Sequence, residues 1–180
     1  KTITLSGPGT GAGTGVYLGG SLVTAEDATG NNIDINGNVF LTGNTTLDTT
    51  ANNGTIDFSG KIDSSSTTNN TLTLKADAGT ITVNDVIGGT KDIGALKIND
   101  GESGAGNITL TGVGASNQIG ITGSVDIGHT STAKVILNGT YYNIDGDTTI
   151  TPTTATDRII IGDALTIKTD GHFTKFVGGT

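Results

Sequence analysis

Apolar and polar residues alternate in short clusters along the chain. In residues 55–58 (TIDF) and 71–74 (TLTL), every second side chain is apolar, the pattern of a strand that buries one face. Gly, Asn and Asp lie between the clusters, as in Asn36-Gly37 and Asn138-Gly139, where the chain can turn sharply. The pattern therefore predicts an all-β chain of short strands and tight corners.

Three series of apolar residues recur at an interval of about 25 residues. Within the first series the spacings are 23, 25 and 27 residues. Series that advance together in this way indicate three short strands per repeat. The series are Ile33, Ile56, Ile81 and Ile108; Val39, Ile62 and Ile87; and Leu47, Leu72, Leu96 and Ile121.

Such recurrence favours a parallel β-solenoid, in which each strand stacks on its counterpart in the next coil, about 4.8 Å away. An antiparallel sandwich gives no reason for like residues to return at like positions. We predict a right-handed parallel β-helix over residues 1–180, with about three short strands per coil of roughly 25 residues and about seven coils. The predicted register is clear for residues 31–112 and ambiguous for residues 113–180, and residues 6–15 form a Gly-rich loop.

Composition and charge narrow the classes of partner. The 180 residues include 30 Gly, 35 Thr and 15 Asn but no Cys, which excludes a disulfide framework and a thiolate metal site. The net charge is −8 and Arg158 is the only Arg, so we expect no nucleic-acid partner. We also expect no membrane insertion, because no apolar run approaches the roughly 20 residues of a membrane span.

The repeats resemble a known family in their phrase pattern: a small residue, then Ile-Asp/Thr-apolar, a Gly corner and a following Val or Ile. Residues 54–63 (GTIDFSGKID) and 79–88 (GTITVNDVIG) show it. With abundant Thr, Asn and Gly and no Cys, the chain resembles the repeat region of large bacterial exported β-solenoid adhesins. The nearest families are the filamentous haemagglutinin-like proteins of two-partner secretion and the passengers of autotransporters. The Asn-Pro-Asn-Leu and Asn-Pro-Tyr-Gly-Ile elements of their secretion domain are absent, so the resemblance is to the repeat stalk.

That resemblance implies a location outside the cell or on the bacterial cell surface. It also implies a structural or adhesive role, as a rigid stalk or contact surface in adhesion or filament assembly. Neither end of the sequence looks like an amphipathic cap, so we expect a single repeat segment of a longer protein. The partners expected are neighbouring copies or flanking repeats, which would bind through the terminal coils, and host or surface glycans.

The densest polar cluster is residues 141–147 (YYNIDGD). It could form a small ligand-contact patch, with Tyr141 or Tyr142 as a platform for a sugar and Asp145 and Asp147 as oxygen ligands for Ca²⁺. A strand followed by an Asp-Gly turn, with one Tyr packed inward, explains it as well, and we favour that interpretation. We expect no cofactor and no catalytic or metal-binding residue, because His129 and His172 lack partners at ligand spacing.

Two other functions are alternatives. Outward Thr rows, suggested by residues 2–4, 71–73 and 80–82, could bind ice or another surface, although Asp34, Asp57 and Lys97 interrupt such rows. Parallel β-helices also include carbohydrate-active enzymes, whose sites need clustered carboxylates with a nearby cation. The Asp residues are scattered here, and we therefore expect that the chain is not an enzyme.

Overall fold

The computed structural model describes residues 2–7, 14–24, 31–102, 106–132, 134–152, 158–162, 165–170, 172 and 174–176. This part of the chain is all-β apart from one short 3-10 helix, η1 (Thr50–Asn52). No helix within it has the length and hydropathy of a membrane span. The strands are β1 (Ile3–Ser6), β2 (Val16–Val23), β3 (Ile33–Asn36), β4 (Val39–Asp48), β5 (Ile56–Phe58), β6 (Ile62–Ser64), β7 (Leu72–Lys75), β8 (Ile81–Val83), β9 (Leu96–Ile98), β10 (Ile108–Leu110), β11 (Val125–Thr132), β12 (Lys134–Leu137), β13 (Tyr141–Asn143), β14 (Thr148–Pro152), β15 (Arg158–Ile161), β16 (Thr166–Lys168) and β17 (Thr174–Phe176).

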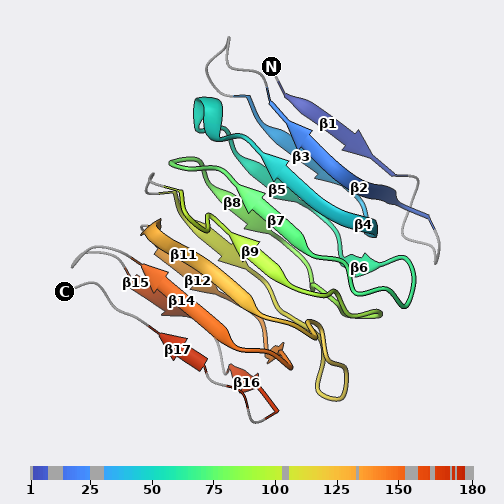
Figure 1. Cartoon of the computed structure of the whole chain (residues 1–180), viewed down its shortest axis with the longest axis vertical. Helices are drawn as coiled ribbons and strands as arrows, with labels where there is room; N and C mark the ends of the chain where they lie inside the picture. Colours follow the sequence, from blue (N-terminus) through green and yellow to red (C-terminus); the bar gives the residue numbers. More distant parts are fainter. Residues whose placement is uncertain are drawn as a thin grey trace.

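The strands form two long parallel sheets and a shorter third wall. The first sheet has the order β1-β3-β5-β8-β10-β12-β15, and the second sheet has the order β2-β4-β7-β9-β11-β14-β17. The third wall consists of β6, β13 and β16 together with single parallel bridges between coils. Figure 1 shows the coils stacked in chain order, with β1 and β2 at one end and β16 and β17 at the other. The chain is therefore a β-solenoid, as predicted.

Seven strands stack in each long sheet, so five inner coils have a neighbour on both sides and one coil lies at each end. The first predicted series is confirmed, because Ile33, Ile56, Ile81 and Ile108 are direct register partners. The second series is confirmed as well, through Val39, Ile62 and Ile87. The structure also settles the register after residue 112. There β12 and β15 extend the first sheet, and β11, β14 and β17 extend the second.

The third predicted series is wrong at both ends. Leu72 pairs with Thr45 and Leu96, and Leu96 pairs with Val125. The inward residue that pairs with Leu72 is Thr45, which is buried although it is polar. The prediction used the next apolar residue, Leu47, which instead pairs with Leu74. At the other end, Ile121 bridges Ile93 and Ile144 on the third wall. A loop at Ala115–Gln118 lengthens this coil and shifts the apparent period.

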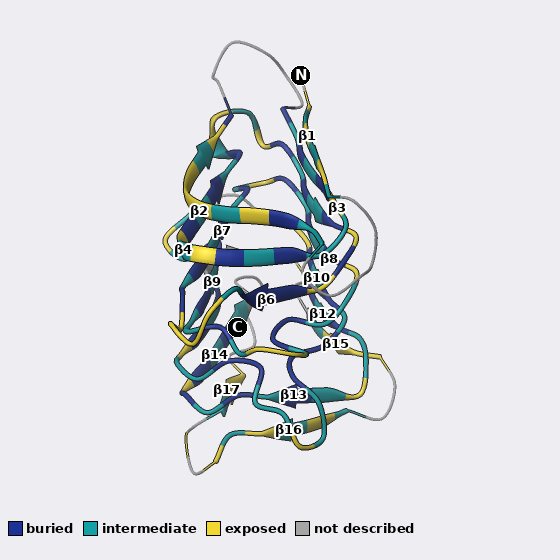
Figure 2. Ribbon diagram, turned by 90° about the vertical axis from the view of Figure 1, so that its right-hand side faces the viewer, coloured by how far each residue is buried: buried dark blue, intermediate teal, exposed yellow. Residues whose placement is uncertain are grey.

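The core is a continuous apolar column inside the three walls. Figure 2 shows buried and exposed positions alternating along the strands, as the pleat requires. Ile56, Phe58, Leu72 and Ile81 are all 0% exposed, and burial of such side chains contributes roughly 1.5–3 kcal/mol each. The longest described strand, β4, has ten residues, and each inner strand of the two long sheets lies between two parallel neighbours that cover its side chains.

Glycines stack on glycines at one corner, as the sequence indicated. A Cβ on Gly79 would collide with the carbonyl oxygen of Gly54, and a Cβ on Gly106 would collide with that of Gly79. Backbone therefore lies directly on backbone at this corner, and only Gly fits. The predicted Gly-rich loop falls mostly on residues 8–13, which lie outside the described residues.

Candidate functional site

The sequence-predicted patch lies on the sixth coil, in β13 and the turn that leads to β14. Tyr141 and Tyr142 are adjacent on β13 and point to opposite sides of the wall. Tyr141 is half-buried and pairs with Thr166, whereas Tyr142 is only 4% exposed. The two rings therefore do not form one surface platform.

Tyr142 belongs to the core. It continues the inward column of the third wall, bridged to Val113 on one side and paired with Ile167 on the other. Its hydroxyl lies 2.9 Å from the Leu110 carbonyl oxygen and 3.0 Å from the Asn138 carbonyl oxygen and can donate to either. Burial raises the pKa of Tyr142 far above its usual value. This is the inward-packed Tyr that the favoured interpretation expected.

The two carboxylates of the patch differ in environment. Asp145 is half-buried beside the third wall, and Asp147 is exposed, with its Oδ1 3.3 Å from His172 Nδ1. Among the described residues, no group of three or more His, Cys, Asp or Glu side chains could hold a metal ion. His129 lies in β11, but its side chain is outside the described part of the chain. Ligand contact by the predicted patch of Tyr141, Tyr142, Asp145 and Asp147 stays a prediction.

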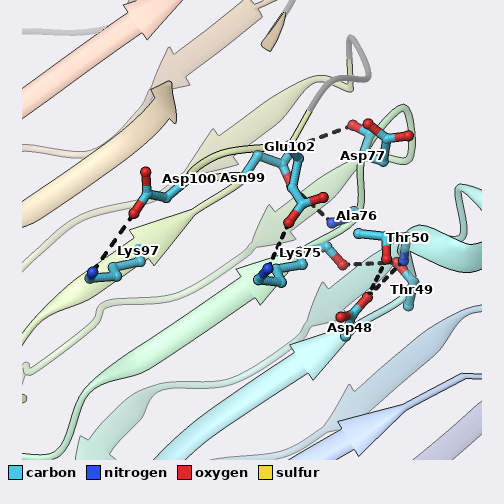
Figure 3. A network of polar contacts seen from close by, with 10 residues as sticks. All are labelled: Asp48, Thr49, Thr50, Lys75, Ala76, Asp77, Lys97, Asn99, Asp100 and Glu102. Carbon is cyan, nitrogen blue, oxygen red and sulfur yellow. Dashed lines mark hydrogen bonds and ion pairs between the residues drawn. The ribbon is translucent and has the colours of Figure 1, made fainter. Parts of the chain in front are cut away.

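Figure 3 shows a polar network at the corner that follows β4, β7 and β9. Lys75 Nζ donates to Glu102 Oε1 at 2.7 Å, and Lys97 lies 3.7 Å from Asp100. The hydrogen bond to Glu102 is the main cause that raises the pKa of Lys75, and partial burial opposes it. Ion pairs that are partly exposed contribute less than about 1 kcal/mol each, so these two pairs add little to the stability of the fold.

The same corner contains a buried residue, Asn99, whose role the sequence analysis missed. Asn99 is 1% exposed, its Oδ1 accepts from the Ala76 N–H at 2.8 Å, and its Nδ2 donates to the Asp77 carbonyl oxygen at 3.3 Å. Asn53, Asp77 and Asn99 all have left-handed backbone, with φ of 53°, 50° and 49°. Asn and Asp tolerate left-handed backbone better than most residues. Their recurrence one coil apart was therefore the signal in the sequence that could have predicted this corner.

The outward rows of the two long sheets are mixed in chemistry. The predicted interruptions at Asp34, Asp57 and Lys97 are confirmed, and Asp126 adds another. In these two rows a Thr follows a Thr only once each, at Thr46–Thr73 and Thr82–Thr109. The rows are Thr4, Asp34, Asp57, Thr82, Thr109, Ile136 and Ile160 on the first sheet, and Ser21, Thr46, Thr73, Lys97, Asp126, Thr149 and Lys175 on the second.

The last coil exposes side chains that face the core direction. Ile161 continues the inward column of Leu110 and Leu137, yet it is 51% exposed. Phe176 continues the column of Ile150 and is 42% exposed. No described strand pairs with the outer edge of β15 or β17.

The first coil has a hollow instead. A cavity of about 200 Å³ is lined by Leu5, Leu18, Leu22, Gly20 and other residues of β1, β2 and β4. Gly20 occupies the inward position at which the next coils carry Thr45 and Leu72, and a Cβ there would meet nothing within 4 Å. The missing side chain therefore contributes to the hollow.

Stacked parallel coils, columns of like residues and Gly-on-Gly corners define the chain as a β-solenoid repeat protein. No protein-family model matches it, and comparisons with curated proteins and with solved structures find no match. The resemblance to exported bacterial adhesins gains nothing from these comparisons and stays a prediction.

Proposed function

We propose that the chain is a structural and adhesive segment of a bacterial cell-surface or secreted fibrous protein, in which it acts as a rigid stalk or contact surface. The observation that supports this role most directly is the unbroken register of the first sheet. Its inward column runs from Ile3 through Ile81 to Ile159 across seven strands. A protein built this way gains length by adding coils, without a larger globular core.

Rigidity follows from how the coils are joined. Hydrogen bonds between parallel strands run along the axis of the stack and recur in both long sheets and in the third wall. Bending the stack would break bonds in several walls at once. The net charge of −8 would keep neighbouring rods soluble and apart.

Location provides the decisive test. Antibodies raised against the folded 180-residue chain should label intact cells of the source organism, or material released from them, before any permeabilisation. Brief protease treatment of intact cells should remove that label while leaving a cytoplasmic marker protein untouched. Labelling that appears only after permeabilisation would contradict an exported role, whatever the chain does in solution.

A further inference from the structure

We propose that Asn36 is a site of spontaneous deamidation, at which the folded chain converts a side-chain amide into aspartate and isoaspartate. The residue after Asn in an Asn-Gly pair has no side chain to hinder attack by its backbone nitrogen. Every such pair therefore has the same local chemistry, and the surrounding structure decides which one reacts. This inference concerns the folded chain itself and does not depend on the proposed function. The sequence contains three such pairs: Asn36-Gly37, Asn53-Gly54 and Asn138-Gly139.

The reaction requires the side-chain carbonyl carbon and the next backbone nitrogen to come together. The nitrogen of Gly37 attacks Cγ of Asn36, a new C–N bond forms, and the bond from Cγ to Nδ2 breaks. Ammonia leaves with the proton from the Gly37 nitrogen, and a cyclic succinimide remains. Water then opens the ring at either carbonyl group and gives aspartate or isoaspartate. Nothing is oxidised or reduced, and water is the co-reactant.

The corner at Asn36 leaves these two atoms free to approach each other. Asn36 is the last residue of β3 and is exposed, and its side chain has no hydrogen bond to another described residue. The Gly37 N–H donates to Ser59 Oγ at 3.0 Å, but Ser59 is exposed, so water can replace its hydroxyl. A Cβ on Gly37 would meet only atoms of Gly7, at 3.5 Å or more. The backbone of Gly37 is therefore not tightly packed.

Asn53 is held at both of the atoms that must move. Its Oδ1 accepts from the Ala78 N–H at 3.2 Å, and the Gly54 N–H donates to the Thr49 carbonyl oxygen at 3.2 Å. Gly54 is buried, and a Cβ there would collide with the Asn31 carbonyl oxygen. Attack by the Gly54 nitrogen therefore requires this corner to open first.

Asn138 is held through its backbone. Its N–H donates to the Leu110 carbonyl oxygen at 2.8 Å, and its own carbonyl oxygen lies 3.0 Å from the Tyr142 hydroxyl. A Cβ on Gly139 would collide with the Thr111 carbonyl oxygen, so the backbone of the neighbouring coil lies directly against it. Asn138 is also half-buried. Local opening is therefore required here as well.

Deamidation at Asn36 would change the corner between β3 and β4. Aspartate adds a negative charge to a chain whose net charge is −8. Isoaspartate instead adds an atom to the main chain shortly before Asn38. The Oδ1 of Asn38 accepts from the Lys61 N–H at 3.2 Å, and its carbonyl oxygen accepts from the Val16 N–H at 2.8 Å. A longer corner therefore strains contacts with the coils on both sides.

Peptide mapping by mass spectrometry tests this assignment on the folded 180-residue chain as it ages at mildly alkaline pH. Asn36 should deamidate at least about tenfold faster than Asn53 and Asn138, because the other two corners must first open locally. In denaturant, where all corners are lost, the three pairs should react at similar rates. A methyltransferase specific for isoaspartate should label the peptide that contains Asn36 first.

Matched variants connect the acidic product to this residue. Asn36→Gln keeps an exposed amide but lengthens the side chain, which disfavours ring closure, and should remove the acidic species that ion-exchange chromatography separates. Asn138→Gln makes the same change at a half-buried corner and should leave that species unchanged. Reaction at Asn53 or Asn138 as fast as at Asn36 in the folded chain would overturn the proposal. An acidic species that persists in Asn36→Gln would overturn it too, and neither result bears on labelling of intact cells.

Discussion

The third coil and the last coil have the same pattern but different surroundings. In the third coil, Phe58 is 0% exposed, whereas the equivalent position at the end of its column, Ile161, is 51% exposed. Likewise Leu74 in the second sheet is 0% exposed and Phe176 is 42% exposed. The sequence pattern within the coil is not what differs. Burial in this fold comes from the neighbouring coils, so the stability of a coil depends on what lies on either side of it.

The largest expected effect on the free energy of unfolding comes from replacing a Phe by Ala, once in the third coil and once in the last coil. Phe58→Ala leaves a cavity between two filled coils and should lower the free energy of unfolding by about 3–5 kcal/mol. Phe176→Ala removes a ring that is 42% exposed and should lower it by less than about 1.5 kcal/mol. Denaturant titration of both variants measures the difference. Equal losses would contradict the dependence of burial on the neighbouring coils.

The corner glycines test whether the backbones of neighbouring coils are in direct contact. Gly79→Ala places a methyl group against the carbonyl oxygen of Gly54, and the backbones of two coils must move apart. We expect a loss of about 1–3 kcal/mol. Gly43→Ala is the matched control, because its Cβ would meet only the Gly19 Cα at 3.8 Å, and it should be neutral or slightly stabilising. A Gly79→Ala variant as stable as Gly43→Ala would contradict close stacking at this corner.

The inward columns could be predicted because apolar residues and glycines recur wherever coil lies on coil. The regular spacing of Ile33, Ile56 and Ile81 is enough to predict the first sheet, in which they are register partners. The third series failed because Thr45 is polar and yet lies inside, where only the neighbouring coils determine what is buried. The register after residue 112 was hidden by the Ala115–Gln118 loop, whose carbonyl oxygens accept from Asn143 one coil later.

The candidate sites were less predictable. The sequence predicted that one Tyr of the pair packs inward, but not which one. That Tyr142 lies inside, with its hydroxyl near the Leu110 and Asn138 carbonyl oxygens, depends on how two coils are aligned.

Asn99 and Asn44 allow the same hydrogen bond to be compared at a buried corner and at an exposed corner. Both accept a backbone N–H through Oδ1, at 2.8 Å from Ala76 and 2.9 Å from Thr71, but Asn99 is buried and Asn44 is exposed. Asn99→Ala strands a buried donor without water to replace the amide and should cost about 1–3 kcal/mol. Asn44→Ala should cost about 0.5 kcal/mol or less. The comparison fails if thermal or denaturant unfolding gives the same loss for both.

The smallest expected effect is the contribution of Tyr142 to the pH dependence of the free energy of unfolding. Burial raises its pKa in the folded chain, while the unfolded chain titrates near pH 10. Below about pH 10 the hydroxyl is neutral in both states, and its contribution to stability is fully present. Above that pH the unfolded chain loses the proton first. The free energy of unfolding should therefore fall by up to about 1.4 kcal/mol per pH unit from this residue, until the folded pKa is reached.

Tyr142→Phe should cost about 1 kcal/mol at pH 7, because it removes one buried hydrogen bond. It should also remove this residue's part of the alkaline slope, so the wild-type and variant curves converge above pH 10. Tyr141→Phe, on the outward side of the same strand, keeps Tyr142 and should therefore keep the part of the alkaline slope that comes from Tyr142. If the Tyr142→Phe curve runs parallel to that of wild type, the hydroxyl must ionise as easily in the folded chain as in the unfolded one. The sixth coil would then be open to water at its core, and the distinction between inner and end coils would begin one coil earlier than the burial of Tyr142 indicates.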